Sequence, residues 1–116
     1  ALLTALRDCG VRPLRPRACW RDGWEGAERT LLAFTFPPRM LNGLLWAAIS
    51  ADLRIHPRLP ATVYLADLER GILVHPYDDR GMDVIATEPA LLAAWFRRFH
   101  GHLLAYDLPR MESFFA

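Results

Sequence analysis

The hydrophobic residues of this chain recur at helical spacing in three segments. The clearest pattern spans residues 88–100, where Thr87 can act as the N-cap and Pro89 occupies the second helical position. A second helix is predicted over residues 39–52, because its apolar positions trace one face at the 3.6-residue period. A short helix is predicted at the start of the chain, with Gly10 just past its end. The apolar positions that define the three helices are Leu2, Leu3, Leu6 and Cys9; Leu41, Leu44, Leu45, Ala48 and Ile49; and Leu91, Leu92, Trp95, Phe96 and Phe99.

Shorter apolar runs, bounded by turn residues, predict four strands. The last three are joined by tight turns at residues 67–71 and 78–81, so they are expected to form an antiparallel meander. Residues 11–26 contain two prolines and two glycines and are expected to form an irregular loop that wraps the domain. The predicted strands are residues 28–36, 61–66, 72–77 and 82–86.

These elements predict an α+β fold, in which a small, mainly antiparallel sheet packs with two main helices. The sheet is expected to contain the three-strand meander plus one more strand. Because the strands are apolar on both faces, helices should cover most of one face. We expect the helix over residues 88–100 to bury Leu92, Trp95, Phe96 and Phe99 against this sheet.

The length of 116 residues predicts a single α+β domain over residues 1–116. Its N-terminal helix and basic loop would occupy residues 1–26, and its core residues 27–116. No apolar run approaches the roughly 18 residues that a membrane span requires, so no membrane association is expected. The first residues do not resemble a signal peptide, and the two cysteines form no C-x-x-C pair. These observations favour a cytoplasmic protein with reduced thiols.

Every strongly basic side chain of the chain is Arg, because the sequence contains no Lys. Mechanisms that depend on a lysine are therefore excluded, including phosphate binding by a P-loop and Schiff-base chemistry. Residues 1–39 contain seven Arg against four acidic residues, although the formal net charge of the whole chain is only +1. The Arg-rich, Lys-free composition is typical of a GC-rich bacterial genome.

The segment from Tyr77 to Asp83 is the first candidate site, because it contains the only acidic cluster that could hold a hard divalent ion. Asp78, Asp79 and Asp83 lie close together, with His75 nearby. The same residues also suit a hairpin turn, in which an Asp accepts from backbone N–H groups and Gly81 adopts a positive φ. We favour the turn over the metal site, and no bound metal is predicted.

The turn interpretation also predicts the register of the hairpin. Tyr77 would pair with Met82, and Pro76 would lie opposite Asp83. Asp83 would then be partly withdrawn from water and would need a hydrogen-bond donor. Arg80 or the turn N–H groups are the nearest candidates.

The second candidate site is the segment from Arg12 to Trp24, which interleaves Arg and Trp. Nucleic-acid binders use this combination for phosphate contacts and base stacking. One short stretch and a pI of about 8.1 are modest for a dedicated binder, so packing of the Trp side chains is favoured and nucleic acid is an unlikely partner. The residues proposed for an interface here are Arg15, Arg17, Trp20, Arg21 and Trp24.

Other reactive side chains form no recognisable active site. His100 and His102 lie two residues apart but lack the further ligands that zinc requires. Ser50 and Ser113 stand in no nucleophile motif. With no assembled catalytic constellation, the sequence favours a protein that is not an enzyme and has no cofactor.

One block of the sequence resembles a known family. Residues 77–86 read Tyr-Asp-Asp-Arg-Gly-x-Asp-Val-Ile-Ala, and the flanking residues 64–67, 72–76 and 103–107 extend the likeness. The match is to a bacterial family catalogued as a domain of unknown function, number 3885, and covers about residues 41–115. The chain departs from the family after the 88–100 helix, where relatives have an Asn-containing loop. The resemblance implies an α+β fold and a bacterial origin, and it implies no activity.

These observations favour a non-catalytic protein-binding module with an unknown protein partner, for example a bacterial immunity-type or accessory protein. The abundant Arg, Trp and Tyr residues are those that populate protein interfaces. Two alternatives remain open. One is a metal-assisted hydrolase centred on Asp78, Asp79 and Asp83, and the other is a weak nucleic-acid binder that uses the Arg12–Trp24 segment.

Overall fold

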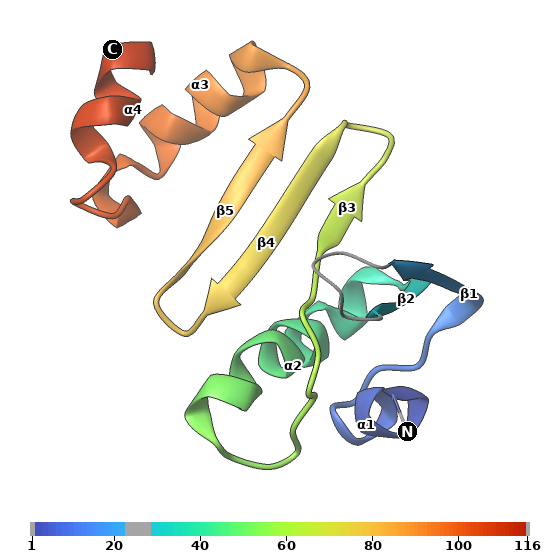
Figure 1. Cartoon of the computed structure of the whole chain (residues 1–116). Coiled ribbons are helices and arrows are strands. Elements are labelled where there is room, and N and C mark those ends of the chain that lie inside the picture. The colour runs from blue at the N-terminus through green and yellow to red at the C-terminus, as the bar shows by residue number, and fades with distance from the viewer. Residues whose placement is uncertain (1, 23–28, 116) are drawn as a thin grey trace. The chain divides into compact units, whose positions relative to one another are not determined.

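Residues 2–22 and 29–115 are described by the computed structural model, and they fall into two units that are divided in sequence between Ala61 and Thr62 (Figure 1). The described residues form four α-helices, a two-stranded antiparallel sheet in the first unit and a three-stranded antiparallel sheet in the second. The α+β fold class is therefore confirmed.

The first helix, α1 (Leu2–Asp8), ends where the sequence predicts, at Gly10. Gly10 has a φ of 81°, which a residue with a Cβ adopts only at a cost in energy. Its N–H donates to the carbonyl of Arg7, and the N–H of Val11 donates to the carbonyl of Leu6. This pair of bonds is the Schellman motif, and its usual hydrophobic contact is supplied by Leu6 and Val11, which are both buried.

The prediction of an irregular loop over residues 11–26 is wrong for residues 14–22. These residues form β1 (Leu14–Asp22), which pairs antiparallel with β2 (Arg29–Thr35). Residues 23–26 of the predicted loop lie outside the described residues. The register slips by one residue between Leu14 and Arg17 and again between Ala18 and Arg21. Such bulges leave an extra residue outside the ladder, and a proline is tolerated there because its missing N–H removes no ladder bond. The prolines of this segment therefore did not prevent a strand.

The helix predicted over residues 39–52 is confirmed as α2 (Leu41–Leu53), preceded by a single 3₁₀ turn, η2 (Pro38–Met40). Its buried residues are Leu44, Ala47, Ala48 and Ser50. Gly43 allows α2 to approach the end of α1, since a Cβ at this position would lie 2.6 Å from the carbonyl oxygen of Cys9.

The segment after α2 returns along the first unit without regular structure. The indole N–H of Trp46 donates to the carbonyl oxygen of Pro57 at 2.9 Å, which fixes the segment to the helix. Leu59 is then fully buried in the core of this unit, together with Val11 and Leu44. This irregular segment therefore contributes to the packing of the first unit.

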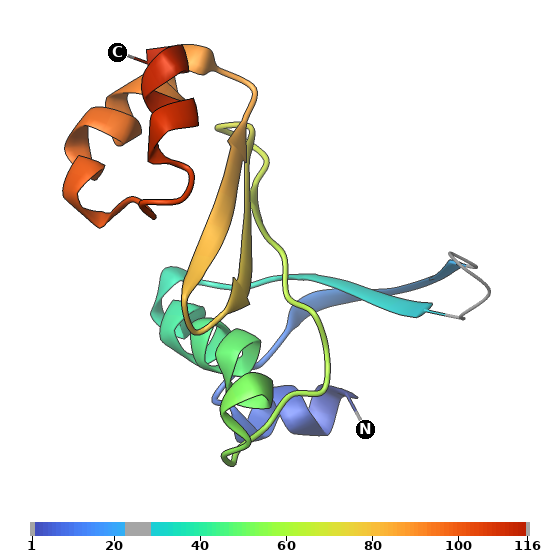
Figure 2. The same ribbon diagram turned by 60° about the vertical axis from the view of Figure 1, so that its left-hand side comes forward.

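The meander of the second unit is confirmed. It consists of β3 (Leu65–Asp67), β4 (Ile72–Asp78) and β5 (Gly81–Ala86). Figure 1 shows β4 in the middle, and Figure 2 shows the same sheet nearly edge-on. The strand predicted over residues 28–36 is β2, and it pairs with β1 rather than with this sheet. In the turn between β3 and β4, Oδ1 of Asp67 accepts from the N–H groups of Glu69 and Arg70, both at 3.1 Å.

The second unit ends with α3 (Pro89–Arg98), a 3₁₀ turn η3 (His100–His102) and α4 (Leu108–Phe115). Figure 1 shows both α-helices on the β5 side of the sheet. The N-cap of α3 is Glu88 and not Thr87, because the N–H of Thr87 donates to Gly71 and extends the β-ladder. Pro89 is therefore the first helical residue, the position that suits its fixed φ.

The predicted burial of the α3 aromatic residues is only partly correct. Phe96 is buried, and the centroid of its ring lies 5.3 Å from that of Phe115, so α4 contributes to covering it. Leu92 and Trp95 are half-buried. Phe99 is 43% exposed and lies beside the guanidinium of Arg98. The sequence pattern could not foresee α4 as the partner of this helix.

Within the described residues, no helix combines the length and the apolar character that a membrane crossing demands.

Candidate functional site

The turn between β4 and β5 is built on Asp78 and Arg80. Oδ1 of Asp78 accepts from the backbone N–H of Arg80 at 2.7 Å, and Oδ2 accepts from Nε of Arg80 at 2.8 Å and from its Nη2. These hydrogen bonds hold the pKa of Asp78 below its usual value and raise that of Arg80. Asp78 therefore acts as the structural anchor of a short turn in which Asp79 and Arg80 are exposed.

The predicted register of this hairpin is wrong by one residue. Pro76 lies opposite Met82, His75 lies opposite Asp83, and Asp78 lies opposite Gly81. The register shift falls between Pro76 and Asp78, so Tyr77 is the extra residue of a bulge. A two-residue loop with a bulge on β4 replaces the expected four-residue turn.

Gly81 is required for a different reason from the one predicted. Within the described residues, the glycines with a positive φ are Gly10 and Gly71, and Gly81 is not among them. A Cβ at Gly81 would instead lie 2.7 Å from Oη of Tyr77 and 3.5 Å from Cδ1 of Leu104. The missing side chain therefore makes room for the Tyr77 ring on the backbone of β5.

The antiparallel register places a row of side chains on one face of the second unit's sheet. Tyr64, one residue before β3, stacks on His75 of β4, with ring centroids 4.6 Å apart and an angle of 24° between the rings. Asp83 of β5 lies opposite His75, and residues directly opposite each other project from the same face. The edge of the Tyr77 ring also faces His75, with centroids 6.3 Å apart.

The neighbouring row on the same face is apolar. Ala66, Leu73 and Ile85 lie opposite one another in the three strands. Tyr64 is 58% exposed, Leu73 38% and Ile85 62%. We call this surface the Tyr64–Ile85 face, and its residues are Tyr64, Ala66, Leu73, His75, Asp83 and Ile85.

Asp83 is not the partly buried acid that the sequence predicts. Its side chain is exposed, and the Arg80 guanidinium expected beside it binds Asp78 instead. The one-residue change of register is the cause, because it moves Asp83 away from the turn and opposite His75. Two acids of the predicted cluster therefore lie in different places. Asp78 lies in the turn, and Asp83 lies on the Tyr64–Ile85 face.

Among the side chains that the structure describes, no three of the His, Cys, Asp and Glu residues converge in a geometry that could hold a metal ion. His100 is engaged elsewhere. Its Nε2 lies 3.3 Å from Oε1 of Glu112, and its ring meets Phe96 edge-on. This contact joins the end of α3 to α4.

The remaining nucleophilic side chains also have structural surroundings. Ser50 is fully buried, and its hydroxyl donates to the carbonyl of Ala47 at 3.3 Å. Ser113 donates to the carbonyl of Arg110 at 2.6 Å within α4. Cys9 is a buried free thiol, and its burial, with a smaller effect from the charge of Asp8, raises the pKa of the thiol. A raised pKa disfavours the reactive thiolate.

The Arg- and Trp-containing segment proposed as an interface is placed only in part. Arg15 is exposed and has a φ of 48°, in the first irregularity of β1. The backbone of Arg17, Trp20 and Arg21 runs in β1. The side chains of these three residues, and Trp24 as a whole, lie outside the described residues.

Sequence reasoning missed Tyr64, because the strand predicted over residues 61–66 gave it no partner. The pairing of Leu65 with Val74 supplies that partner, since it brings Tyr64 opposite His75. The alternation of residues within one strand does not show which residue of the neighbouring strand lies opposite. Predicting this pair would have required the register of β3 against β4.

A known protein family matches most of this chain. The family model described as "Domain of unknown function (DUF3885)" matches residues 16–107, which include both sheets almost completely. The resemblance noted around the β4–β5 hairpin is thereby confirmed, and it extends further towards the N-terminus than the sequence block indicated. No curated protein and no solved structure matches the chain at a significant level.

Proposed function

This chain belongs to the family described as Domain of unknown function (DUF3885), and we propose that it acts as a non-catalytic protein-binding module. The observation that supports the proposal is the Tyr64–Ile85 face, on which Tyr64, Leu73 and Ile85 are exposed beside one another. The solvent face of an antiparallel sheet normally alternates to polar residues. Exposed apolar residues that cluster on one surface, with polar groups at the rim, are typical of a protein-interaction site.

The composition of the face favours one kind of partner, a protein that presents an apolar patch with a basic side chain. Tyr64 and Ile85 supply large contact areas, and aromatic residues are enriched at interfaces. Asp83 stands exposed beside them. The second unit contains eight acidic residues against five Arg, so its charge also attracts a basic surface.

The narrower form of this proposal is a bacterial immunity-type or accessory protein that acts in the cytoplasm. An immunity-type protein blocks a toxin by binding it, which needs a surface and no catalytic group. The sequence of a neighbouring gene would identify such a partner directly. Co-expression of that gene product with this chain is then the first binding assay.

The experiment compares two substitutions that make the same change of polarity. Ile85→Glu places a charge on the Tyr64–Ile85 face, and Leu68→Glu places one in the β3–β4 turn, where Leu68 is 92% exposed. We expect a partner purified with the wild-type chain to bind Ile85→Glu at least about tenfold more weakly. Leu68→Glu should retain it.

A third variant, Asp83→Arg, tests the charge of the partner. It should slow association with a basic surface, and the effect should shrink at high salt. A partner that binds Ile85→Glu and the wild type equally would contradict the proposed face. A dimer of the chain that Ile85→Glu dissociates would instead show that the face pairs with a second copy.

A further inference from the structure

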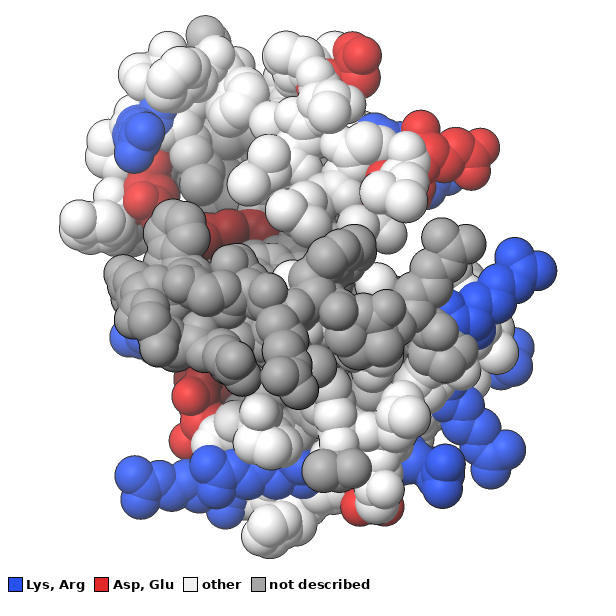
Figure 3. Space-filling model, turned by 45° about the vertical axis from the view of Figure 1, so that its right-hand side comes forward, with Lys and Arg blue, Asp and Glu red and all other residues white. Residues whose placement is uncertain are grey.

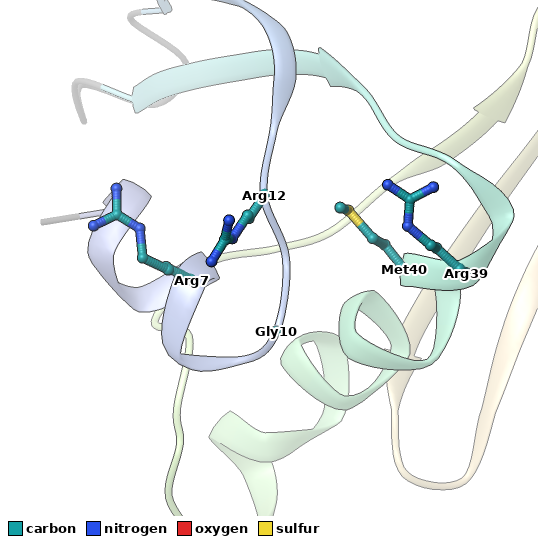
Figure 4. Close-up of a pocket in the computed structure, with 5 residues that line it drawn as sticks. All are labelled: Arg7, Gly10, Arg12, Arg39 and Met40. Atoms are coloured by element: carbon teal, nitrogen blue, oxygen red, sulfur yellow. The ribbon is translucent and has the colours of Figure 1, made fainter.

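The first unit contains an open hollow of about 490 Å³ that is lined by arginine side chains. Arg7 comes from α1, Arg12 from the segment after it, and Arg39 from η2 (Figure 4). The other lining residues are Gly10 and Met40. The described residues that line this hollow thus include three arginines and no carboxylate.

The backbone beneath these arginines is fixed by close packing. The Schellman turn at Gly10 sets the direction in which the chain leaves α1, and therefore the distance from Arg7 to Arg12. Gly43 holds α2 against the same turn, because its missing Cβ admits the carbonyl of Cys9. This contact places the two sides of the hollow relative to each other. The arginines are exposed, but their anchor points belong to the core of the unit.

The hollow also lies at the beginning of a long helix. Met40, which lines it, is the N-cap residue of the 13-residue α2. No side chain caps this end, and the first turn contains no acidic residue. The N–H groups of Met40 and Leu41 already donate to the carbonyls of Pro37 and Pro38, because η2 runs directly into α2. The positive charge of the hollow therefore comes from the three arginines.

We propose that this hollow is a binding site for a small phosphate-bearing molecule, such as a phosphate monoester. The planar guanidinium group donates two parallel hydrogen bonds to phosphate oxygens, so several arginines around one hollow suit a dianion with three free oxygens. The first unit contains nine Arg against five acidic residues, and Arg side chains project from several points of it in Figure 3. The volume exceeds that of phosphate alone and leaves room for an attached organic group.

The site is distinct from the Tyr64–Ile85 face, and its test does not depend on a protein partner. The full chain, labelled with ¹⁵N, is titrated with inorganic phosphate and with phenyl phosphate at constant ionic strength. We expect saturable shifts of the amide signals of Gly10, Val11 and Met40, with phenyl phosphate binding more tightly. Acetate at the same concentration should leave these signals in place.

Three variants distinguish a specific phosphate site from non-specific attraction of phosphate to the positive charge of the first unit. Arg12→Gln should weaken phosphate binding by about tenfold, because it removes charge-assisted hydrogen bonds. Arg39→Lys keeps the charge and loses the planar fork, so it should also weaken binding. Arg58→Gln makes the same change of charge at an exposed position that does not line the hollow, and it should bind phosphate as the wild type does.

Equal weakening by Arg12→Gln and Arg58→Gln would overturn the proposal, since it would show non-specific attraction. Absence of saturable shifts with either phosphate compound would overturn it too. Affinity that appears only with oligonucleotides and rises with their length would assign the hollow to a nucleic-acid backbone instead. The unliganded melting temperature of each variant, compared with the wild type, checks that the fold is retained.

Discussion

Gly43 of α2 faces the carbonyl oxygen of Cys9, which belongs to a peptide group within the Schellman turn. A Cβ on Gly43 would lie 2.6 Å from this oxygen and 3.1 Å from Cγ2 of Val11. The closest atom belongs to backbone, so it cannot turn aside as the tip of a side chain would. The contact therefore sets how closely α2 approaches α1.

Gly43→Ala is expected to lower the free energy of unfolding by about 1–2 kcal/mol. Overpacking of this kind costs about 1–3 kcal/mol, which exceeds the gain of about 1 kcal/mol that Ala normally brings to a helix interior. Urea denaturation measures the difference. Gly101→Ala is the control, because a Cβ there meets nothing within 4 Å, and it should change stability by less than about 0.5 kcal/mol. A Gly43→Ala variant more stable than the wild type would contradict the close approach.

The Asp78–Arg80 pair predicts a pH dependence of stability. The pKa of Asp78 is lowered from 3.8 in the folded chain, chiefly by the side-chain hydrogen bonds of Arg80. The folded state therefore binds the proton less readily than the unfolded state. The stabilisation is complete above the ordinary pKa and is lost as the pH falls through the lowered value.

Asp78→Asn should accordingly be less stable than the wild type at neutral pH. It keeps an acceptor for the N–H of Arg80 but loses the charge that the guanidinium binds. The difference should disappear at a pH below the lowered pKa, as followed by thermal melts over an acid pH series. Asp79→Asn, in the same turn, should show no such trend. A difference that persisted unchanged into strong acid would mean that the ion pair contributes nothing.

Phe96 and Phe99 test the packing of α3. Phe96→Ala should cost about 3–5 kcal/mol, because a buried ring is replaced by a cavity beside Phe115. Phe99→Ala should cost less than about 1 kcal/mol, because that ring is largely exposed. Chemical denaturation of both variants gives the comparison. Equal costs would show that Phe99 is buried, as its position in the helical pattern suggests.

Tyr77 and Gly81 should be energetically coupled. Gly81→Ala brings a Cβ to 2.7 Å from the Tyr77 hydroxyl, while the ring carbon that bears it would be 3.3 Å away. The substitution should therefore be more damaging in the wild type than in a Tyr77→Phe background, by about 0.5–1 kcal/mol. A double-mutant cycle measures this coupling. Strict additivity would mean that the Tyr77 hydroxyl does not lie against Gly81.

The sequence predicted those elements whose signals are local. The helix ending at Gly10, the helix over Leu41–Leu53 and the meander with its two Asp-containing turns all follow from periodicity and turn chemistry. β1 was missed because Pro13 and Pro16 normally mark a loop. Pro13 precedes the strand, and only the pairing with β2 supplies the bulge that accommodates Pro16. A long-range partner overrode the local signal.

In the candidate site, too, the residues with local signals could be predicted, whereas those that depend on a distant partner could not. Asp78 was recognised as a turn residue, because an Asx turn involves only its neighbours. The exposed position of Asp83 depends on a bulge at Tyr77, which shifts the register of β4 and β5 by one residue. The stack of Tyr64 on His75 depends on the separate pairing of β3 with β4. Arg39 is far in sequence from Arg7 and Arg12, and Gly43 brings their elements together through a backbone contact that no spacing pattern predicts.

The Tyr77 ring over Gly81 has a consequence for the history of the family. The two positions share one space, so they cannot diverge independently. In related chains, a large aromatic residue at position 77 should occur together with glycine at position 81, whereas a small residue at 77 should release position 81 to other amino acids. Correlated substitution of these two positions in an alignment of family members would then be the result of this one steric contact.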